Sequence, residues 1–565
     1  MKIFMKTKKN KTNKTNLSLF KKSYTLKELI KMNKCSLAFT ICCIIIFISA
    51  IFWSILSGIC YFNSDTASIN MYVREQIQEK SFFPKGWYNG EEIPIISPHL
   101  LILPLTLLNI PAYLSRQITN VIFIAILFVV IFYVIKKIFD YNTSMMANIF
   151  VFSGISASYF TYLYAQVSYA PIFFIIFFSI GLFFDSVTER LAVQNKRKFI
   201  LFLFMVFFAS LNGNRYFQMF TIPLIMAILT YIFFEDYMEN AFWKSLWKNA
   251  SKIIALMAPL MIAGYALYSL LYKSLSVASN RALSAITYTN IANILENIQK
   301  FFASYISIGG YEGNYPLLSL AGFAGLIKLC LHILFTILFP YLLAKKYKTL
   351  SHKVKIFLWY CAWNWLLIFL IFTFTSFIHS EAENRYIMFQ TVLLYILSSY
   401  YISTFLIDKG RKIVMLFSTC CIIGFGVLSS FEMHFVYSGK LLRHEAQDNY
   451  ESVISTLKKN HLNFGYATFW NSHTFTVMSD FDIEIAPIHF TITETETSIF
   501  PFRLLSASRV FMPEYHTGQS FLMLTKSECE EYLSENTLPN VIKTIPCKDY
   551  IIYVFNHNII EQPTL

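Results

Sequence analysis

Long runs of apolar residues without a charge constrain the fold of this 565-residue chain more than any other feature. The first run extends for 30 residues, from Cys35 to Ser64. About 20 consecutive apolar residues can cross the hydrocarbon core of a bilayer as a helix. Charged residues make up only 14% of the chain, against about 25% in soluble proteins. The sequence therefore excludes a soluble enzyme, a disordered chain and a coiled coil, and it predicts a polytopic α-helical membrane protein.

The charge-free runs predict about eleven transmembrane helices. The run from Cys35 is too long for the core of a signal peptide, and no small-residue cleavage pattern ends it, so we expect an uncleaved first span. The other spans are expected in Gln117–Ile135, Tyr141–Phe184 (two helices that turn near Tyr164–Ser168), Phe199–Leu211, Phe217–Phe234, Ile253–Leu271, Leu317–Ala344, Ile356–Phe377, Tyr386–Ile407 and Ile413–Phe431. An odd number of spans places the two termini on opposite sides of the membrane.

The basic residues give the orientation. The chain has 47 Lys and Arg against 33 Asp and Glu, and its first 34 residues hold 11 Lys and one Glu. Residues 1–35 are predicted to be a basic cytoplasmic tail that contacts anionic lipid, or alternatively a disordered solubilising tail. Every predicted inner loop carries two to five basic residues, as the positive-inside rule requires. We therefore expect the N-terminus inside, residues 63–116 and the C-terminal part outside, and no nucleic-acid partner.

The sequence changes character after the last span. Residues 444–460 read as an amphipathic helix, residues 527–534 as a second helix, and residues 465–469, 482–488, 521–524 and 550–555 as short strands. We expect a transmembrane domain over residues 36–432 and a small extracytoplasmic α/β domain over residues 433–565. Cys529 and Cys547 lie in this second domain, either as a disulfide or as two free thiols. Nowhere do Cys and His show the spacing of a metal site.

The first predicted outer loop, residues 63–116, carries the most chemical information. Asp65 follows the first span directly, at the expected membrane surface. After it, Ile69, Tyr72, Val73 and Ile77 recur at helical spacing, which predicts an amphipathic helix that lies along the membrane interface. A loop rich in Trp, Tyr and Gly follows. This arrangement is suited to holding one carboxylate over a lipid-borne substrate.

Taken in order, these features resemble the GT-C superfamily of integral-membrane glycosyltransferases, in the bacterial branch related to protein O-mannosyltransferases and aminoarabinose transferases. The resemblance is carried by Asp65, Tyr72-Val73-Arg74-Glu75, Trp87…Gly90…Pro94, Ser97-Pro98-His99, Glu383-Asn384-Arg385-Tyr386 and Gly465–Asn471. It implies a polyprenyl-phosphate-linked sugar donor and chemistry on the outer face. Many members carry paired acids near this loop, whereas Asn63-Ser64-Asp65 offers one. No cofactor or metal ligand is therefore assigned, and a divalent metal stays open.

Glycosyl transfer needs a base for the acceptor hydroxyl and cations for the leaving phosphate. Asp65 is the candidate base, and the alternative is that it caps the following helix. His99 and Glu383 are candidates to assist it, unless His99 is only a loop histidine and Glu383 only pairs with Arg385. Arg215, Arg385 and Arg74 are the candidate phosphate ligands. Their alternatives are snorkelling to the lipid headgroups for Arg215 and Arg385, and solvation of the interfacial helix for Arg74.

We therefore expect a multi-pass glycosyltransferase of the bacterial inner membrane, with a periplasmic C-terminal domain. Its partners would be membrane lipids, a polyprenyl-phosphate-sugar donor, and a glycan, lipid or protein acceptor. The alternative is a transporter or polymerase for envelope polysaccharide. A transporter favours inverted repeats or broken helices in matching halves, and the sequence shows no repeat.

Overall fold

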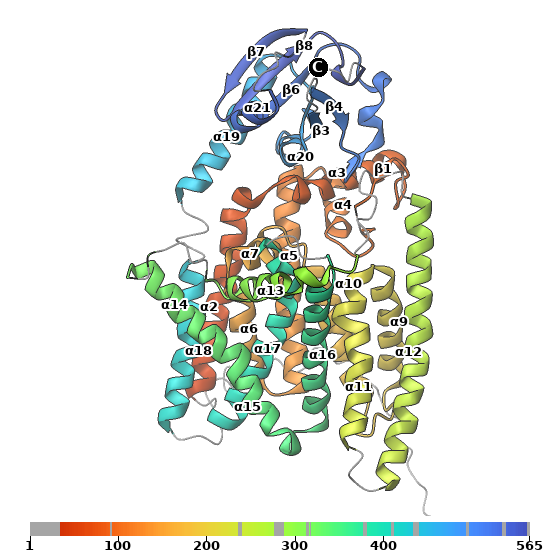
Figure 1. The fold of residues 1–565 in the computed structure, drawn as a ribbon, viewed down its shortest axis with the longest axis vertical. Helices are drawn as coiled ribbons and strands as arrows, with labels where there is room; N and C mark the ends of the chain where they lie inside the picture. The colour runs from red at the N-terminus through yellow and green to blue at the C-terminus, as the bar shows by residue number, and fades with distance from the viewer. Residues whose placement is uncertain are drawn as a thin grey trace, which may run out of the picture.

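The computed structural model describes residues 34–90, 93–235, 240–275, 287–311, 316, 318–376, 381–407, 412–432, 440–492, 497–533, 538 and 540–561. The predicted basic tail lies outside the described residues, apart from its last two positions. Within the described part, the chain forms a bundle of apolar helices and a smaller region with a β-sheet at one end of that bundle (Figure 1).

Eight of the described helical segments are long and apolar enough to cross a membrane, and each overlaps a predicted span. They are Cys35–Tyr61, Ala112–Ile138, Asn214–Glu235, Trp243–Leu275, Gly322–Lys345, His352–Phe374, Asn384–Ile407 and Ile413–Ser430. The predicted helical membrane protein is thus confirmed. The number of eleven spans and the orientation remain predictions.

The three other predicted spans correspond to shorter helices. Helix α6 (Tyr141–Phe152) has 12 residues, α8 (Ala170–Ser186) has 17 and α9 (Lys196–Leu211) has 16. Between α6 and α8 the chain breaks near Gly154, whose φ is 66°, and then forms α7 (Ala157–Phe160), continued by η2 (Thr161–Ala165). This segment meets α8 at an angle of 80°. The turn predicted near 164–168 is therefore present, within a bent pair that counts as one further span at most.

The helices of the bundle have the following bounds. They are α2 (Lys34–Ser57), α5 (Ala112–Ile138), α10 (Asn214–Tyr216), α11 (Ile222–Glu235), α12 (Asn240–Leu275), α13 (Ile294–Ile308), α14 (Leu320–Ile333), α15 (Phe339–Lys345), α16 (His352–Phe374), η7 (Glu381–Ile387), α17 (Met388–Tyr401) and α18 (Lys412–Glu432). Helix α13 runs across the others in Figure 1, and α12 stands at the edge. A continuous apolar cluster fills the bundle, centred on α6, α8 and α17.

The C-terminal region, residues 440–561, is an α/β unit with a six-stranded mixed sheet. Its strand order is β4-β3-β2-β6-β8-β7. The elements are α19 (Lys440–Lys459), β2 (Phe464–Thr468), α20 (Phe469–Met478), β3 (Glu484–Ile492), β4 (Thr497–Pro501), β5 (Ser506–Ala507), β6 (Ser520–Thr525), α21 (Lys526–Leu533), β7 (Val541–Cys547) and β8 (Tyr550–Phe555). All predicted strands and helices are present, and α20, β4, β5 and β7 are additional. Cys529 and Cys547 are free thiols.

The segment after α2 lies between the bundle and the C-terminal region. It forms α3 (Ser64–Glu79), β1 (Trp87–Tyr88) and α4 (His99–Leu107). Strand β1 pairs antiparallel with β5, so that Trp87 faces Ala507. Apolar side chains of α3 and of the sheet share one buried cluster. The first loop and the C-terminal region are therefore packed into one unit.

This packing corrects the expected role of α3. The sequence predicted a helix with an apolar face on lipid and a solvated polar face. In the structure Val73 on the apolar side and Glu75 on the polar side are both buried. Helix α20 of the C-terminal region covers one side of α3, and an internal cavity lies on another. Polar residues of α3 consequently find partners inside the protein instead of water.

Candidate active site

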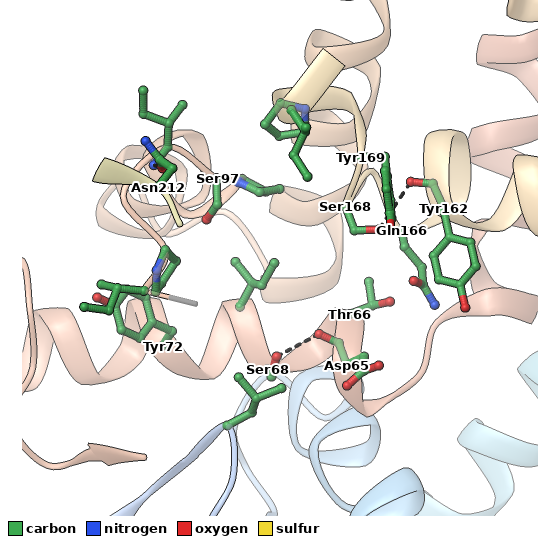
Figure 2. A pocket seen from close by; sticks show the side chains of 18 of the residues that line it. Asp65, Thr66, Ser68, Tyr72, Ser97, Tyr162, Gln166, Ser168, Tyr169 and Asn212 are labelled. Atoms are coloured by element: carbon green, nitrogen blue, oxygen red, sulfur yellow. Dashed lines mark hydrogen bonds between the residues drawn. The ribbon is translucent and has the colours of Figure 1, made fainter. Parts of the chain in front are cut away.

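A cavity of about 300 Å³ lies where the bundle meets the C-terminal region. One side is α3, which contributes Asp65, Thr66 and Ile69. The opposite side is the turn before α8, and Figure 2 shows Asp65 and Thr66 across the cavity from Tyr162, Gln166 and Tyr169. The loop at 93–98, the residue that follows α9, and residues of α5, α10 and η7 also contribute to the lining. Segments that are far apart in the sequence thus meet around one space.

Asp65 lies in the first turn of α3, and it is not the cap of that helix. The cap is Asn63, whose Oδ1 accepts a hydrogen bond from the backbone N–H of Thr66 at 3.1 Å. Ser68 Oγ donates to the backbone oxygen of Asp65 at 2.7 Å. The capping explanation for Asp65 is therefore wrong, because Asn63 already performs that function. The Asp65 side chain is partly exposed and lines the cavity.

Arg215 and Arg385 line the same cavity as Asp65. Both guanidinium groups lie over the ring of Tyr386, with their central carbons 5.7 and 4.9 Å from its centroid. Arg385 also donates to the hydroxyl of Tyr162 at 3.4 Å, and Arg215 lies 5.5 Å from the Tyr169 centroid. Such cation–π contacts attract a cation to the face of an aromatic ring and help to fix its position. Two predicted phosphate ligands from distant helices are thus brought together beside the candidate base.

Arg116 is a third arginine in the cavity lining, and the sequence analysis missed it. It lies in the second turn of α5 and is 1% exposed. One nitrogen donates to the backbone oxygen of Gln166, whereas Nε and Nη1 have no hydrogen-bond partner within the described part of the protein. The predicted span began at Gln117, so Arg116 was read as a loop residue. A charge inside an apolar helix is a signal that could have identified it.

A second cavity of about 720 Å³ adjoins the first. Asp65, Tyr162, Arg215, Arg385 and Leu505 line both cavities. The remaining walls of the second cavity come largely from the C-terminal region. Asp65 and the two arginines therefore lie where the first and second cavities meet.

Two predicted site residues lie outside both cavities. His99 is fully buried against Tyr72 and Phe82, its Nδ1 is 2.7 Å from Ser97 Oγ, and burial lowers its pKa to about 4. Arg74 pairs with Glu484 of β3 at 2.9 Å. It therefore joins α3 to the C-terminal region and does not reach the space that Arg215 and Arg385 share. Neither side chain lines either of the cavities that Asp65 lines.

Glu383 falls in η7, and its side chain lies outside the described part of the structure. Lys328 and His332, four residues apart in α14, are both buried. Lys328 Nζ donates to Ile155 O at 2.7 Å, and His332 Nδ1 is 2.7 Å from the Tyr395 hydroxyl. They tie helices together and line neither cavity.

The described residues offer little for a metal ion. No group of three or more His, Cys, Asp or Glu within this part of the chain is arranged to hold one. Among the described residues that line the two cavities, Asp65 is the one carboxylate. Divalent cations of the Mg²⁺ and Ca²⁺ type prefer several oxygen ligands. The described lining is therefore arranged for an anion beside three arginines and fits a cation poorly.

No family model matches the sequence, and no curated protein matches it significantly. Among solved structures, the chain is similar to ArnT from Cupriavidus metallidurans in the apo state (9% identity, TM-score 0.49, 86% of this chain and 93% of that chain) and bound to undecaprenyl phosphate (9%, 0.48, 90% and 97%). It is also similar to the Archaeoglobus fulgidus oligosaccharyltransferase in complex with Zn and sulfate (10%, 0.44, 86% and 68%). At such low identity the likeness is one of layout and carries no activity over.

Proposed function

We propose that this protein is a membrane glycosyltransferase that moves a sugar from a polyprenyl-phosphate-linked donor to a hydroxyl group of an envelope acceptor. The observation that carries the proposal is the convergence of Asp65, Arg116, Arg215 and Arg385 on one cavity at the end of the helix bundle. The reaction would take place at the outer face of a bacterial inner membrane, with the C-terminal region in the periplasm.

In this reaction Asp65 accepts the proton of the acceptor hydroxyl as its oxygen attacks the anomeric carbon of the donor sugar. The new carbon–oxygen bond forms while the bond from that carbon to the phosphate oxygen breaks. The bonding electron pair leaves with the polyprenyl phosphate. Positive charge preorganised around a leaving phosphate stabilises the transition state. Arg116, Arg215 and Arg385 would supply that charge, and the proposal assigns no metal.

Substitution of Asp65 tests the base. General-base catalysis contributes roughly 10²–10⁴-fold, so Asp65→Asn and Asp65→Ala should both reduce sugar transfer by about that factor. Because Asn63 caps α3, both proteins should insert at normal abundance. The measurement is the mass of surface glycans from cells that lack the gene and carry each variant, at matched protein level.

Asn63→Ala is the matched control, since loss of a helix cap costs about 1 kcal/mol and should lower abundance more than activity per molecule. Full glycan modification by Asp65→Asn would contradict the proposal, because an amide cannot accept the proton.

A further inference from the structure

The wall of the second cavity is unusually aromatic where the C-terminal region forms it. Trp470, Phe490 and Tyr532 line it together with Phe469 and Phe502. The rings of Phe490 and Tyr532 are stacked, with centroids 4.7 Å apart and planes 17° apart. Trp470 is 59% exposed, although it lies at the wall of a cavity and carries the largest apolar side chain. This surface is open for a ligand to contact.

The residues on both sides of Trp470 in the sequence are held by hydrogen bonds to one carboxylate. Glu528 of α21 accepts from Thr468 Oγ1 at 2.5 Å and from Asn471 Nδ2 at 3.2 Å, on the two sides of Trp470 in the sequence. Glu528 also accepts from the backbone N–H of Thr525 at 2.8 Å. The start of α20 is thereby attached to α21. An exposed Trp on a fixed backbone loses little entropy when it contacts a ligand.

The same wall is electrically neutral. None of the described residues that the C-terminal region contributes to this cavity is Asp, Glu, Lys or Arg. The charged residues of this cavity, Asp65, Arg215 and Arg385, belong to its other walls, so the aromatic wall itself offers a charged group no counter-ion. A pyranose ring is matched to this wall, because its axial C–H bonds present a weakly positive face to the negative face of an aromatic ring.

We propose that this aromatic wall is the acceptor subsite, and that it binds an uncharged sugar ring of a glycan or glycolipid on Trp470 and the Phe490–Tyr532 pair. A ring held there lies in a cavity that Asp65 also lines, which places the acceptor and the candidate base in one space. This inference rests on the proposed function for the reaction, but binding of the acceptor sugar is a separate property. The acceptor is accordingly a saccharide and not a polypeptide.

Equilibrium binding to the full-length protein in nanodiscs tests the subsite. The probes are delipidated surface polysaccharide from cells that lack the gene, tryptic peptides of envelope proteins from the same cells, and undecaprenyl phosphate. The variants are Trp470→Ala, Trp470→Phe and the control Trp247→Ala. Trp247 is also exposed, at 47%, but lies on α12 away from both cavities.

We expect Trp470→Ala to weaken polysaccharide binding tenfold or more, as roughly expected for truncation of a central aromatic contact. Trp470→Phe, which keeps a stacking face, should retain most of the affinity, and Trp247→Ala should retain all of it. All variants should bind undecaprenyl phosphate as the wild type does, which shows that they are folded. Unchanged polysaccharide binding by Trp470→Ala, no binding by the wild type, or Trp470-dependent binding of the peptides would each overturn the subsite. If the wild type does not bind undecaprenyl phosphate, that result contradicts the proposed donor but not the saccharide site.

Discussion

The three cavity arginines differ in what surrounds their charge. Arg215 and Arg385 are partly exposed and lie over tyrosine rings. Arg116 is buried, and two of its nitrogens have no hydrogen-bond partner within the described part of the protein. A buried charge without a partner destabilises a folded protein. Arg116 is therefore the residue whose environment is most improved by an anionic ligand.

Arg116→Met should consequently stabilise the ligand-free protein while it weakens donor binding. Replacement of buried charged groups by apolar side chains of similar volume is often neutral or stabilising, by about 1–4 kcal/mol. Undecaprenyl phosphate should stabilise the wild type by mass action and Arg116→Met much less. Thermal unfolding midpoints with and without the lipid measure both effects. Arg385→Ala is the comparison, for which we expect weaker lipid binding without a gain in stability. If Arg116→Met is destabilised, Arg116 only stabilises the fold through its hydrogen bond to Gln166.

The sequence indicated which kinds of residue form the candidate site, but it did not indicate which of the candidates lie together. Asp65, Arg215 and Arg385 were each identified because a charged residue stands at the end of an apolar run. Arg74 and His99 lie in the same predicted outer loop as Asp65 and were also candidates, with solvation of the interfacial helix and a plain loop histidine as their alternatives. The position of Arg74 depends on the C-terminal region, which covers α3 and provides Glu484 as its partner, whereas His99 packs against Tyr72 and Phe82. No local pattern reveals a contact between residues that are 410 positions apart.

Two buried histidines predict how stability depends on pH. Burial lowers the pKa of His99 and of His473 to about 4, from about 6.5 in an unfolded chain. The unfolded state therefore binds protons first as the pH falls, so stability is full above pH 6.5 and decreases between about pH 6.5 and 4. The free energy of unfolding, measured by denaturant titration at pH 7.5 and 5, should be lower at pH 5. His473→Gln should reduce this difference; an equal difference in the variant would contradict the assignment.

At the scale of elements, α3 is held to the sheet by a buried network of charges. Arg509 Nη2 lies 2.7 Å from Glu75 Oε1 and 3.3 Å from Glu484 Oε1, and Arg74 Nη1 lies 2.9 Å from the same Glu484 oxygen. The side chain of Glu75 is only 2% exposed. Burial alone lowers the pKa of Arg509, but hydrogen bonds to Glu75 and the charges of Glu484 and Glu75 raise it above its usual value. The helix that carries Asp65 is therefore positioned from the C-terminal region.

Loss of one partner from this network should be costly. Arg509→Met leaves Glu75 buried without its counter-ion, and the free energy of unfolding should fall by about 3–5 kcal/mol. The control is Lys458→Met, which removes a pair with Asp482 whose side chains are 50% and 64% exposed and should cost less than about 1 kcal/mol. Denaturant titration of the purified proteins compares the two. Equal losses would mean that the network does not attach α3.

Elements were predictable in proportion to their length and regularity. The eight long apolar helices and the predicted strands of the sheet are all present, because composition and period alone specify them. The break at Gly154 and the 80° bend before α8 were not predicted in this form. Both occur inside a run of 44 uncharged residues, where no charged residue marks the end of one helix and the start of the next. The bend nevertheless places Gln166 and Tyr169 at the cavity.

At the scale of the whole molecule, contacts restrict the number of membrane crossings. Residues after α2 pair with the C-terminal region, through Trp87 and Ala507 and through Glu75 and Arg509. These two parts must therefore lie on the same side of the membrane, and the chain between them must cross an even number of times. Seven of the eight long spans follow α2, which is odd. Either the bent pair adds one crossing, for nine in all, or α6, α8 and α9 each add one, for eleven.

The residues that line the cavity favour eleven membrane crossings. The side of the membrane on which the loop after α8 lies distinguishes eleven crossings from nine. Tyr162 and Tyr169 line the cavity with Asp65, so α8 begins on the side of the C-terminal region. Its 17 residues extend for about 25 Å, which carries the chain to the other side at Ser186. Arg190 and Lys196–Lys198 follow, as expected of an inner loop. Glu189→Cys, in a protein with the exposed Cys330 and Cys420 changed to Ser, should thus be protected from a membrane-impermeant maleimide in intact cells, while Asn460→Cys is labelled. Labelling of both positions from outside would establish nine crossings, with α9 returning to the side on which it began.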